Sequence, residues 1–166
     1  MSQEKRKVAV VTDGACSLTP ATGQEYGVHV APVYVTFGDK TFQAGVNLDA
    51  DEFYRLLRSS PRLPMTAQPT AQDFERLFRA LAQQAEAIVA VVISPHMSAT
   101  LDSALAAKAQ LPDIPIHVID SRSVSIGLGM MAIAAARAAA AGQDAGQVVR
   151  LVEELTAKMN IIFTVE

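Results

Sequence analysis

Side chains that can bind an anion follow several of the apolar runs in this sequence. They are Asp13, Ser94, Ser98, Thr100, Asp120 and Ser121, and Thr66 lies on a nearby loop between two prolines. Ligands of an open parallel sheet bind beyond the carboxyl ends of its strands, which is where these residues are expected. Most of them carry hydroxyl groups, and a helix is expected to open at Ser98. Short neutral donors at a helix N-terminus suit an anion, because the free N–H groups and the helix dipole both point toward it.

The same residue types also have ordinary structural roles. Ser98 could be a helix cap, and Thr70 is expected to be one because it opens the capping-box pattern Thr70-Ala-Gln-Asp73. Asp13 and Asp120, at the expected strand ends, could instead accept hydrogen bonds from the backbone of their own loops. The sequence is compatible with both interpretations.

Histidine and cysteine give weaker indications of chemistry. His29 and His117 fall inside expected strands, which favours structural roles, whereas His96 lies in one of the candidate loops. Cys16 is expected to be a small buried hydrophobic residue. A hydrolase triad of Ser98, His96 and Asp120 has poor geometry, because a histidine so close to the serine in one tight loop is badly placed to accept its proton. We therefore expect no catalytic residue and no metal site.

The familiar nucleotide-binding and hydrolase motifs do not fit. Gly127-Leu-Gly129-Met-Met-Ala132 has the glycine spacing of a dinucleotide site, but it does not follow Asp120 directly, and that site needs an immediate strand-to-helix turn. These glycines are expected to permit close helix packing instead. The sequence contains neither a phosphate loop ending in Gly-Lys-Ser or Gly-Lys-Thr nor a Gly-x-Ser-x-Gly elbow.

Charge and cysteine content narrow the class of protein. The 166 residues include 14 Lys and Arg against 17 Asp and Glu, a net charge of -3, so a nucleic-acid partner is not expected. The longest apolar-rich stretch, 127–141, contains Arg137 and is too short for a membrane span. Lys5-Arg6-Lys7 precedes too few apolar residues for a signal-peptide core. Cys16 is the only cysteine, which excludes an internal disulfide and fits a reducing cytoplasm.

Segments with the pattern of a strand alternate with segments of helical period along one domain. This alternation predicts an α/β fold of three layers, with a mainly parallel sheet covered by helices on both faces. Strands are expected at 7–12, 28–37, 40–43, 87–93, 116–120 and 161–165, helices at 20–26, 50–59, 70–81, 98–109, 126–141 and 144–159, and a loop at 64–69. The last strand either pairs within this chain or belongs to a sequence that continues.

Five blocks of the sequence resemble, in the same order along the chain, the amino-terminal domain of the DegV family of bacterial fatty-acid-binding proteins. The blocks are Val10-Val-Thr-Asp-Gly-Ala-Cys-Ser-Leu18, Ala31-Pro-Val-Tyr-Val-Thr-Phe37, Thr66-Ala-Gln-Pro-Thr70, Ser94-Pro-His-Met-Ser-Ala-Thr100 and Asp120-Ser-Arg-Ser-Val-Ser-Ile-Gly-Leu-Gly129. The sequence departs from the family pattern at Gly14, Ala15, Ser17, Ala67 and Ala99. Thr66 and Ser98, which in the family hold the fatty-acid carboxylate, are both present.

The resemblance implies a lipid carrier rather than an enzyme. A long-chain fatty acid would be the ligand, no cofactor would be required, and a separate ATP-dependent fatty acid kinase would convert the presented carboxylate to an acyl phosphate. The acyl chain would lie in an apolar space lined by side chains around Met65, Met97, Ile126 and Met130. The family also has a carboxy-terminal domain that helps to close the carboxylate site. That domain is expected to be missing here, so the chain would need it, or a second copy of itself, as a partner.

Two other functions are compatible with the residues. A phosphotransfer or sugar-kinase-like domain would use a phosphate-accepting histidine after the first strand, but the segment 13–17 has none. An inert interaction module that lacks its second half would bind no lipid. A fatty acid retained on the purified protein would distinguish the carrier from both.

Overall fold

Four parallel strands form the central sheet of the computed structural model, which describes residues 5–162 and 164. They are β1 (Arg6–Asp13), β2 (Val28–Ala31), β6 (Ala85–Val92) and β7 (Ile116–Asp120), in the spatial order β2-β1-β6-β7. All four run in the same direction, so their carboxyl ends meet at one edge of the sheet.

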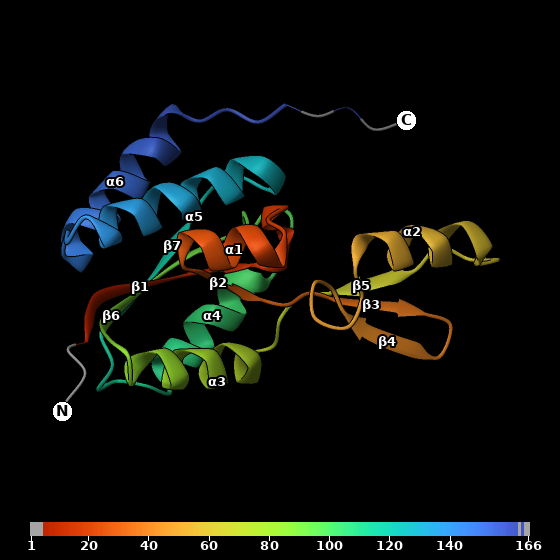
Figure 1. The fold of residues 1–166 in the computed structure, drawn as a ribbon, viewed down its shortest axis with the longest axis horizontal. Coiled ribbons are helices and arrows are strands. Elements are labelled where there is room, and N and C mark those ends of the chain that lie inside the picture. Colours follow the sequence, from red (N-terminus) through yellow and green to blue (C-terminus); the bar gives the residue numbers. More distant parts are fainter. Residues whose placement is uncertain (1–4, 163, 165–166) are drawn as a thin grey trace.

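Helices cover both faces of this sheet (Figure 1). One face carries α1 (Pro20–Tyr26), α5 (Ser125–Ala140) and α6 (Ala145–Lys158), and the other carries α3 (Ala71–Ala82) and α4 (Thr100–Ala109). The expected three-layer α/β architecture is therefore confirmed.

The two cores follow from the alternation of side chains along the strands. Val8 and Val10 of β1 pack with Met131 of α5, whereas Ala9 and Val11 belong to the opposite core. That second core is filled by aromatic and small side chains of α3 and α4, among them Phe74, Phe78, Ala104 and Ala107. Because β1 and β6 are buried on both faces along most of their length, their sequences are largely apolar, which is the pattern that predicted them.

A second, smaller sheet lies beside the first (Figure 1, right). It consists of β3 (Tyr34–Phe37), β4 (Lys40–Gln43) and β5 (Met65–Ala67) in the antiparallel order β4-β3-β5, with α2 (Ala50–Ser59) between β4 and β5 in the chain. Two expectations were wrong here. The single strand 28–37 is divided between the two sheets at Pro32 and Val33, because proline has no N–H to donate to a ladder. The expected loop 64–69 contains β5.

Most helices begin and end close to the residues predicted from the sequence. Thr19, Asp49, Thr70 and Asp144 each cap the helix that follows, and Thr70 and Asp144 form complete capping boxes. Gly27 ends α1 in the left-handed conformation, at φ 70°. Side-chain oxygens that satisfy the first N–H groups thus determine where most of these helices begin.

The expected strand 161–165 lies partly outside the described residues, and Ile161, Ile162 and Thr164, which are described, form no strand. Among the described residues, no helix combines the length and the hydrophobicity needed to cross a bilayer.

Candidate functional site

Asp13, Ser94 and Asp120 lie at the same edge of the parallel sheet, as predicted from the ends of β1, β6 and β7. The Asp13 carboxylate is buried and accepts hydrogen bonds from the backbone N–H groups of Ala15 at 2.9 Å and Ile93 at 2.8 Å. Burial raises the pKa of this carboxyl group, and the two backbone hydrogen bonds oppose that rise only in part. Asp13 therefore holds the ends of β1 and β6 together.

The loop from Ser94 to Thr100 leads into α4. The backbone carbonyl of Ser94 accepts hydrogen bonds from the N–H groups of Met97 and Ser98, which closes a tight turn. The hydroxyls of Ser98 and Thr100 lie 2.9 Å apart, and Thr100 is buried at the first position of the helix. The N-cap is Ala99, which forms no side-chain cap, and the Thr100 N–H donates to the Ser98 hydroxyl at 3.3 Å. The other N–H groups of the first turn are the ones that an anion could bind.

The loop after β7 lies against the loop after β6. The Ser94 N–H donates to the Ser123 carbonyl at 3.1 Å. Asp120 accepts a hydrogen bond from the Arg122 N–H at 2.7 Å, and the buried Ser121 hydroxyl bonds within the turn to Ser123. Asp120 and Ser121 thus hold their own loop, which is the structural one of the two interpretations that the sequence allowed for Asp120.

Two serines that the sequence analysis did not select complete this edge. Ser17 and Ser125 both have left-handed backbones, with φ of 53° and 56°, and their hydroxyls lie 3.0 Å apart. Such conformations cost non-glycine residues energy and concentrate at functional sites. The buried Thr12 hydroxyl, one position before Asp13, has no hydrogen-bond partner in the part of the chain that the structure describes. Ser17 and Ser125 lie within the segments 10–18 and 120–129, which resemble the DegV family, so their hydroxyl groups were the signal that the sequence offered.

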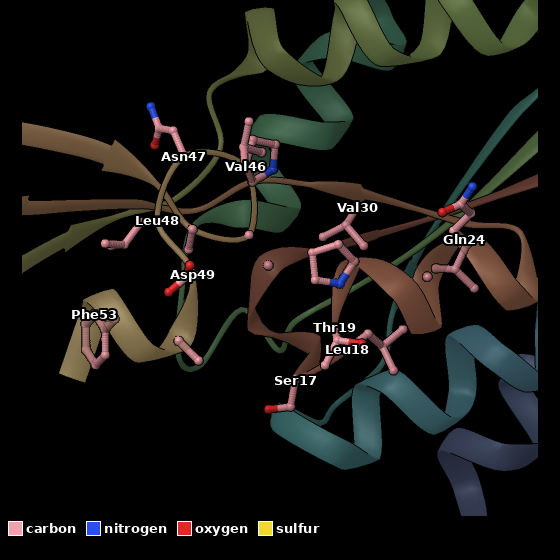
Figure 2. A pocket seen from close by; sticks show the side chains of 18 of the residues that line it. Ser17, Leu18, Thr19, Gln24, Val30, Val46, Asn47, Leu48, Asp49 and Phe53 are labelled. Atoms are coloured by element: carbon pink, nitrogen blue, oxygen red, sulfur yellow. The ribbon is translucent and has the colours of Figure 1, made fainter. Parts of the chain in front are cut away.

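A groove of about 1630 Å³ separates α1 from the segment that leads into α2. In Figure 2, Ser17, Leu18 and Thr19 lie on one side of it and Leu48, Asp49 and Phe53 lie on the other. Val30 and Val35 add apolar surface from β2 and β3. The groove therefore combines an apolar wall with a rim of hydroxyl and carboxylate groups.

Thr66 is the predicted site residue that lines this groove. It is exposed on β5, opposite Val35 of β3. Ser98 lies on the loop after β6, and among the described residues no hydrogen bond joins the two side chains. Their convergence on one carboxylate stays a prediction.

The four apolar residues expected around the acyl chain are exposed. Met65, Met97, Ile126 and Met130 have 69%, 49%, 59% and 57% of their surface accessible. They lie on β5, on the loop after β6 and on α5, and they do not line the groove. In the described residues they form open apolar surface rather than the wall of a tunnel.

Cys16 and the paired glycines have packing roles. Cys16 is buried in the core beneath α5, and burial raises the pKa of its thiol to about 11, so it stays protonated. Gly127 and Gly129 pack closely against Ser123 and Cys16, which confirms that they permit helix packing. His29 and His117 lie in β2 and β7 as expected. Within the described residues, no group of three His, Cys, Asp or Glu side chains could hold a metal ion.

Comparison with known proteins identifies the family. The family model described as "Uncharacterised protein, DegV family" matches residues 7–166. The chain belongs to the DegV family. A DegV domain-containing protein of Caldanaerobacter subterraneus is 32% identical over 89% of this chain and 52% of its own length.

Solved DegV structures share the fold. The DegV protein of Bacillus subtilis, described as a fatty acid binding protein, superposes with a TM-score of 0.86 at 25% identity and covers 92% of this chain and 55% of its own. A DegV family protein of Thermus thermophilus, described by its fatty acid binding, superposes with a TM-score of 0.81 at 28% identity and covers 91% and 54%. The chain thus spans about half the length of the relatives it matches.

Proposed function

We propose that this DegV chain binds a long-chain fatty acid and holds its carboxylate with the hydroxyls of Thr66 and Ser98. The observation that carries the proposal is the N-terminus of α4, where the N-cap Ala99 supplies no side-chain acceptor and the hydroxyls of Ser98 and Thr100 lie together, in a fold shared with relatives described as fatty-acid-binding. Asp13, Ser94, Thr100, Asp120 and Ser121 support the edge at which the carboxylate would lie.

The chemistry of the head group favours this arrangement. A carboxylate that leaves water needs several donors, and each hydrogen bond to a charged group contributes roughly 1.5 to 3 kcal/mol. Two hydroxyls and a helix N-terminus can supply them. Burial of ~14 methylene groups contributes roughly 11 kcal/mol before association costs, so the tail supplies most of the affinity and the hydroxyls orient the head.

The proposed role is that of a carrier in the cytoplasm. A separate kinase would transfer the terminal phosphoryl group of ATP to a carboxylate oxygen of the presented acid, leaving ADP and an acyl phosphate. The chain itself would contribute binding and orientation. Because the relatives are nearly twice as long, we propose that their other half, or a second copy of this chain, closes the carboxylate site and covers the exposed Met97, Ile126 and Met130.

Native mass spectrometry of the freshly purified chain is the first test, and we expect a bound fatty acid. Affinity for tetradecanoic acid is then measured for Thr66→Ala and Ser98→Ala, alone and with the carboxy-terminal half of a DegV relative added. Each substitution should weaken binding about tenfold, the equivalent of roughly 1.4 kcal/mol. Thr41→Ala is the control, because Thr41 is an exposed threonine on β4 of the same small sheet. Unchanged affinity in both variants, with lower thermal stability, would mean that the two residues are structural.

A further inference from the structure

The Tyr34 hydroxyl joins the small sheet to the three-layer body. It donates a hydrogen bond of 2.9 Å to the carboxylate of Asp73, which lies in the first turn of α3. Gln43 of β4 donates to the same Tyr34 oxygen at 3.3 Å. A single tyrosine ring on β3 thus connects two strands of the small sheet to a helix of the central sheet.

Asp73 is a well-fixed acceptor for this hydrogen bond. Only 8% of its surface is accessible. One carboxylate oxygen accepts from the Thr70 N–H at 2.8 Å and the Thr70 hydroxyl at 2.7 Å, and the other accepts from Tyr34 and the Arg76 guanidinium. Hydrogen bonds to an ionised carboxylate are about twice as strong as those between neutral groups.

These contacts close a ring that includes β5. Tyr34 pairs with Ala67 in the β3–β5 ladder, and only Gln68 and Pro69 separate Ala67 from Thr70. Thr70 is bound to Asp73, and Asp73 is bound to Tyr34. The carboxyl-terminal end of the strand that carries Thr66 is therefore held within a short, closed ring of contacts.

The direction of the Tyr34 side chain also shows which face of β5 meets the groove. Neighbouring residues of a strand point to opposite faces. Because Tyr34 points toward Asp73, Val35 points the other way, and its ladder partner Thr66 shares that face. Val35 and Thr66 both line the groove.

We infer that Tyr34, held by Asp73, is the positioning residue that presents the Thr66 hydroxyl to the groove. The inference rests on the proposed function of Thr66 as a ligand of the fatty-acid carboxylate. It assigns Tyr34 no contact with the ligand, since Tyr34 acts through β5. Loss of its hydroxyl should leave the central sheet intact and reduce the selectivity of binding for the acid head group.

The first experiment needs no ligand. Hydrogen exchange is measured for Tyr34→Phe and for the control Tyr26→Phe, which removes a hydroxyl that contacts Arg137 at the end of α1. In Tyr34→Phe, exchange should accelerate at least tenfold in 65–67 and remain unchanged in β1 and β6. In Tyr26→Phe it should remain unchanged in 65–67. Unaltered exchange in 65–67 of Tyr34→Phe would overturn the inference.

The second experiment separates positioning from general loosening. Affinities for tetradecanoic acid and tetradecanol are compared, because only the acid presents a carboxylate. Tyr34→Phe should weaken binding of the acid about fivefold and that of the alcohol less than twofold. In a Thr66→Ala background, Tyr34→Phe should change acid affinity less than twofold, since residues that act as one unit are non-additive.

The outcomes distinguish the two proposals. If Thr66→Ala weakens acid binding but Tyr34→Phe weakens acid and alcohol equally, or adds its full effect to that of Thr66→Ala, Tyr34 is only structural and the inference is wrong. If Thr66→Ala leaves acid binding unchanged, the proposed role of Thr66 fails, whereas the exchange rates still report whether Tyr34 holds β5.

Discussion

The backbone carbonyl oxygen of Cys16 occupies the space that a Cβ atom at Gly129 would need. The short 3₁₀ segment η1 (Gly14–Cys16) and α5 therefore approach each other as closely as their backbones allow. Ser17 directly follows η1 and Ser125 begins α5, and their hydroxyls lie 3.0 Å apart.

Substitution of Gly129 tests this packing. Ala is intrinsically better than Gly in a helix by about 1 kcal/mol, but a Cβ here meets backbone that cannot move aside easily. We expect Gly129→Ala to lower the free energy of unfolding by roughly 1 to 3 kcal/mol in urea denaturation. Gly146→Ala on α6, where the neighbours are side chains, should change it by no more than about 1 kcal/mol. Equal effects of the two substitutions would contradict the close approach.

The Asp73 carboxylate should make the protein sensitive to acid. Burial opposes its ionisation, but the hydrogen bonds from Thr70 and Tyr34 and the charge of Arg76 outweigh burial and lower its pKa below 3.8. The ionised group therefore stabilises the fold above pH 3.8, and this contribution is lost as the pH falls through the lowered pKa. Asp73→Asn should unfold more easily by about 2 kcal/mol at neutral pH and lose this acid dependence. Asp113→Asn, at an exposed loop residue, is the control for thermal melts between neutral and acid pH.

Asp13 should have the opposite pH dependence. Burial raises its pKa above 3.8, so its contribution to stability is fully present below that pH and is lost as the pH rises through the raised pKa. Asp13→Asn cannot ionise, but its amide cannot accept from both Ala15 and Ile93. We expect a loss of about 1 to 3 kcal/mol in the free energy of unfolding at low pH, which becomes smaller above pH 3.8 as the wild type ionises. A stability difference that grows with pH would show that the carboxylate is stabilised by its environment.

The open apolar surface at the carboxyl edge should bind a hydrophobic dye. Ile126 and Met130 lie four positions apart on α5 and therefore share one helix face, and both are exposed. The double variant Ile126→Gln, Met130→Gln should bind less dye, measured by fluorescence titration. If the wild-type chain forms a dimer, the variant should form less of it, measured by size-exclusion chromatography. Leu105→Gln on α4 is the control. If the wild-type chain is a monomer that binds no dye, this face of α5 is not a docking surface.

Local signals in the sequence determined the central sheet, its helices and their caps. Doubly buried strands need uninterrupted apolar residues, and the first turn of a helix needs a side-chain oxygen, so β1, β6, Thr19 and Thr70 could be predicted without knowledge of distant contacts. Parallel order then placed Asp13, Ser94 and Asp120 at one edge. These features depend on neighbouring residues, or on a rule that holds for any parallel sheet.

Which sheet each strand joins depends on packing between segments that are distant in the sequence. The strand expected at 28–37 reads as one apolar run, yet Val28–Ala31 pairs with β1 and Tyr34–Phe37 pairs with β4 and β5. All three residues of β5 are exposed, so the strand has no buried face, and it is held by its pairing with β3. The groove, the Ser17–Ser125 pair and the Tyr34–Asp73 hydrogen bond likewise join residues far apart in the chain. A sequence pattern indicates which residues favour a helix or a strand locally, whereas these contacts depend on how the helices and strands pack against one another.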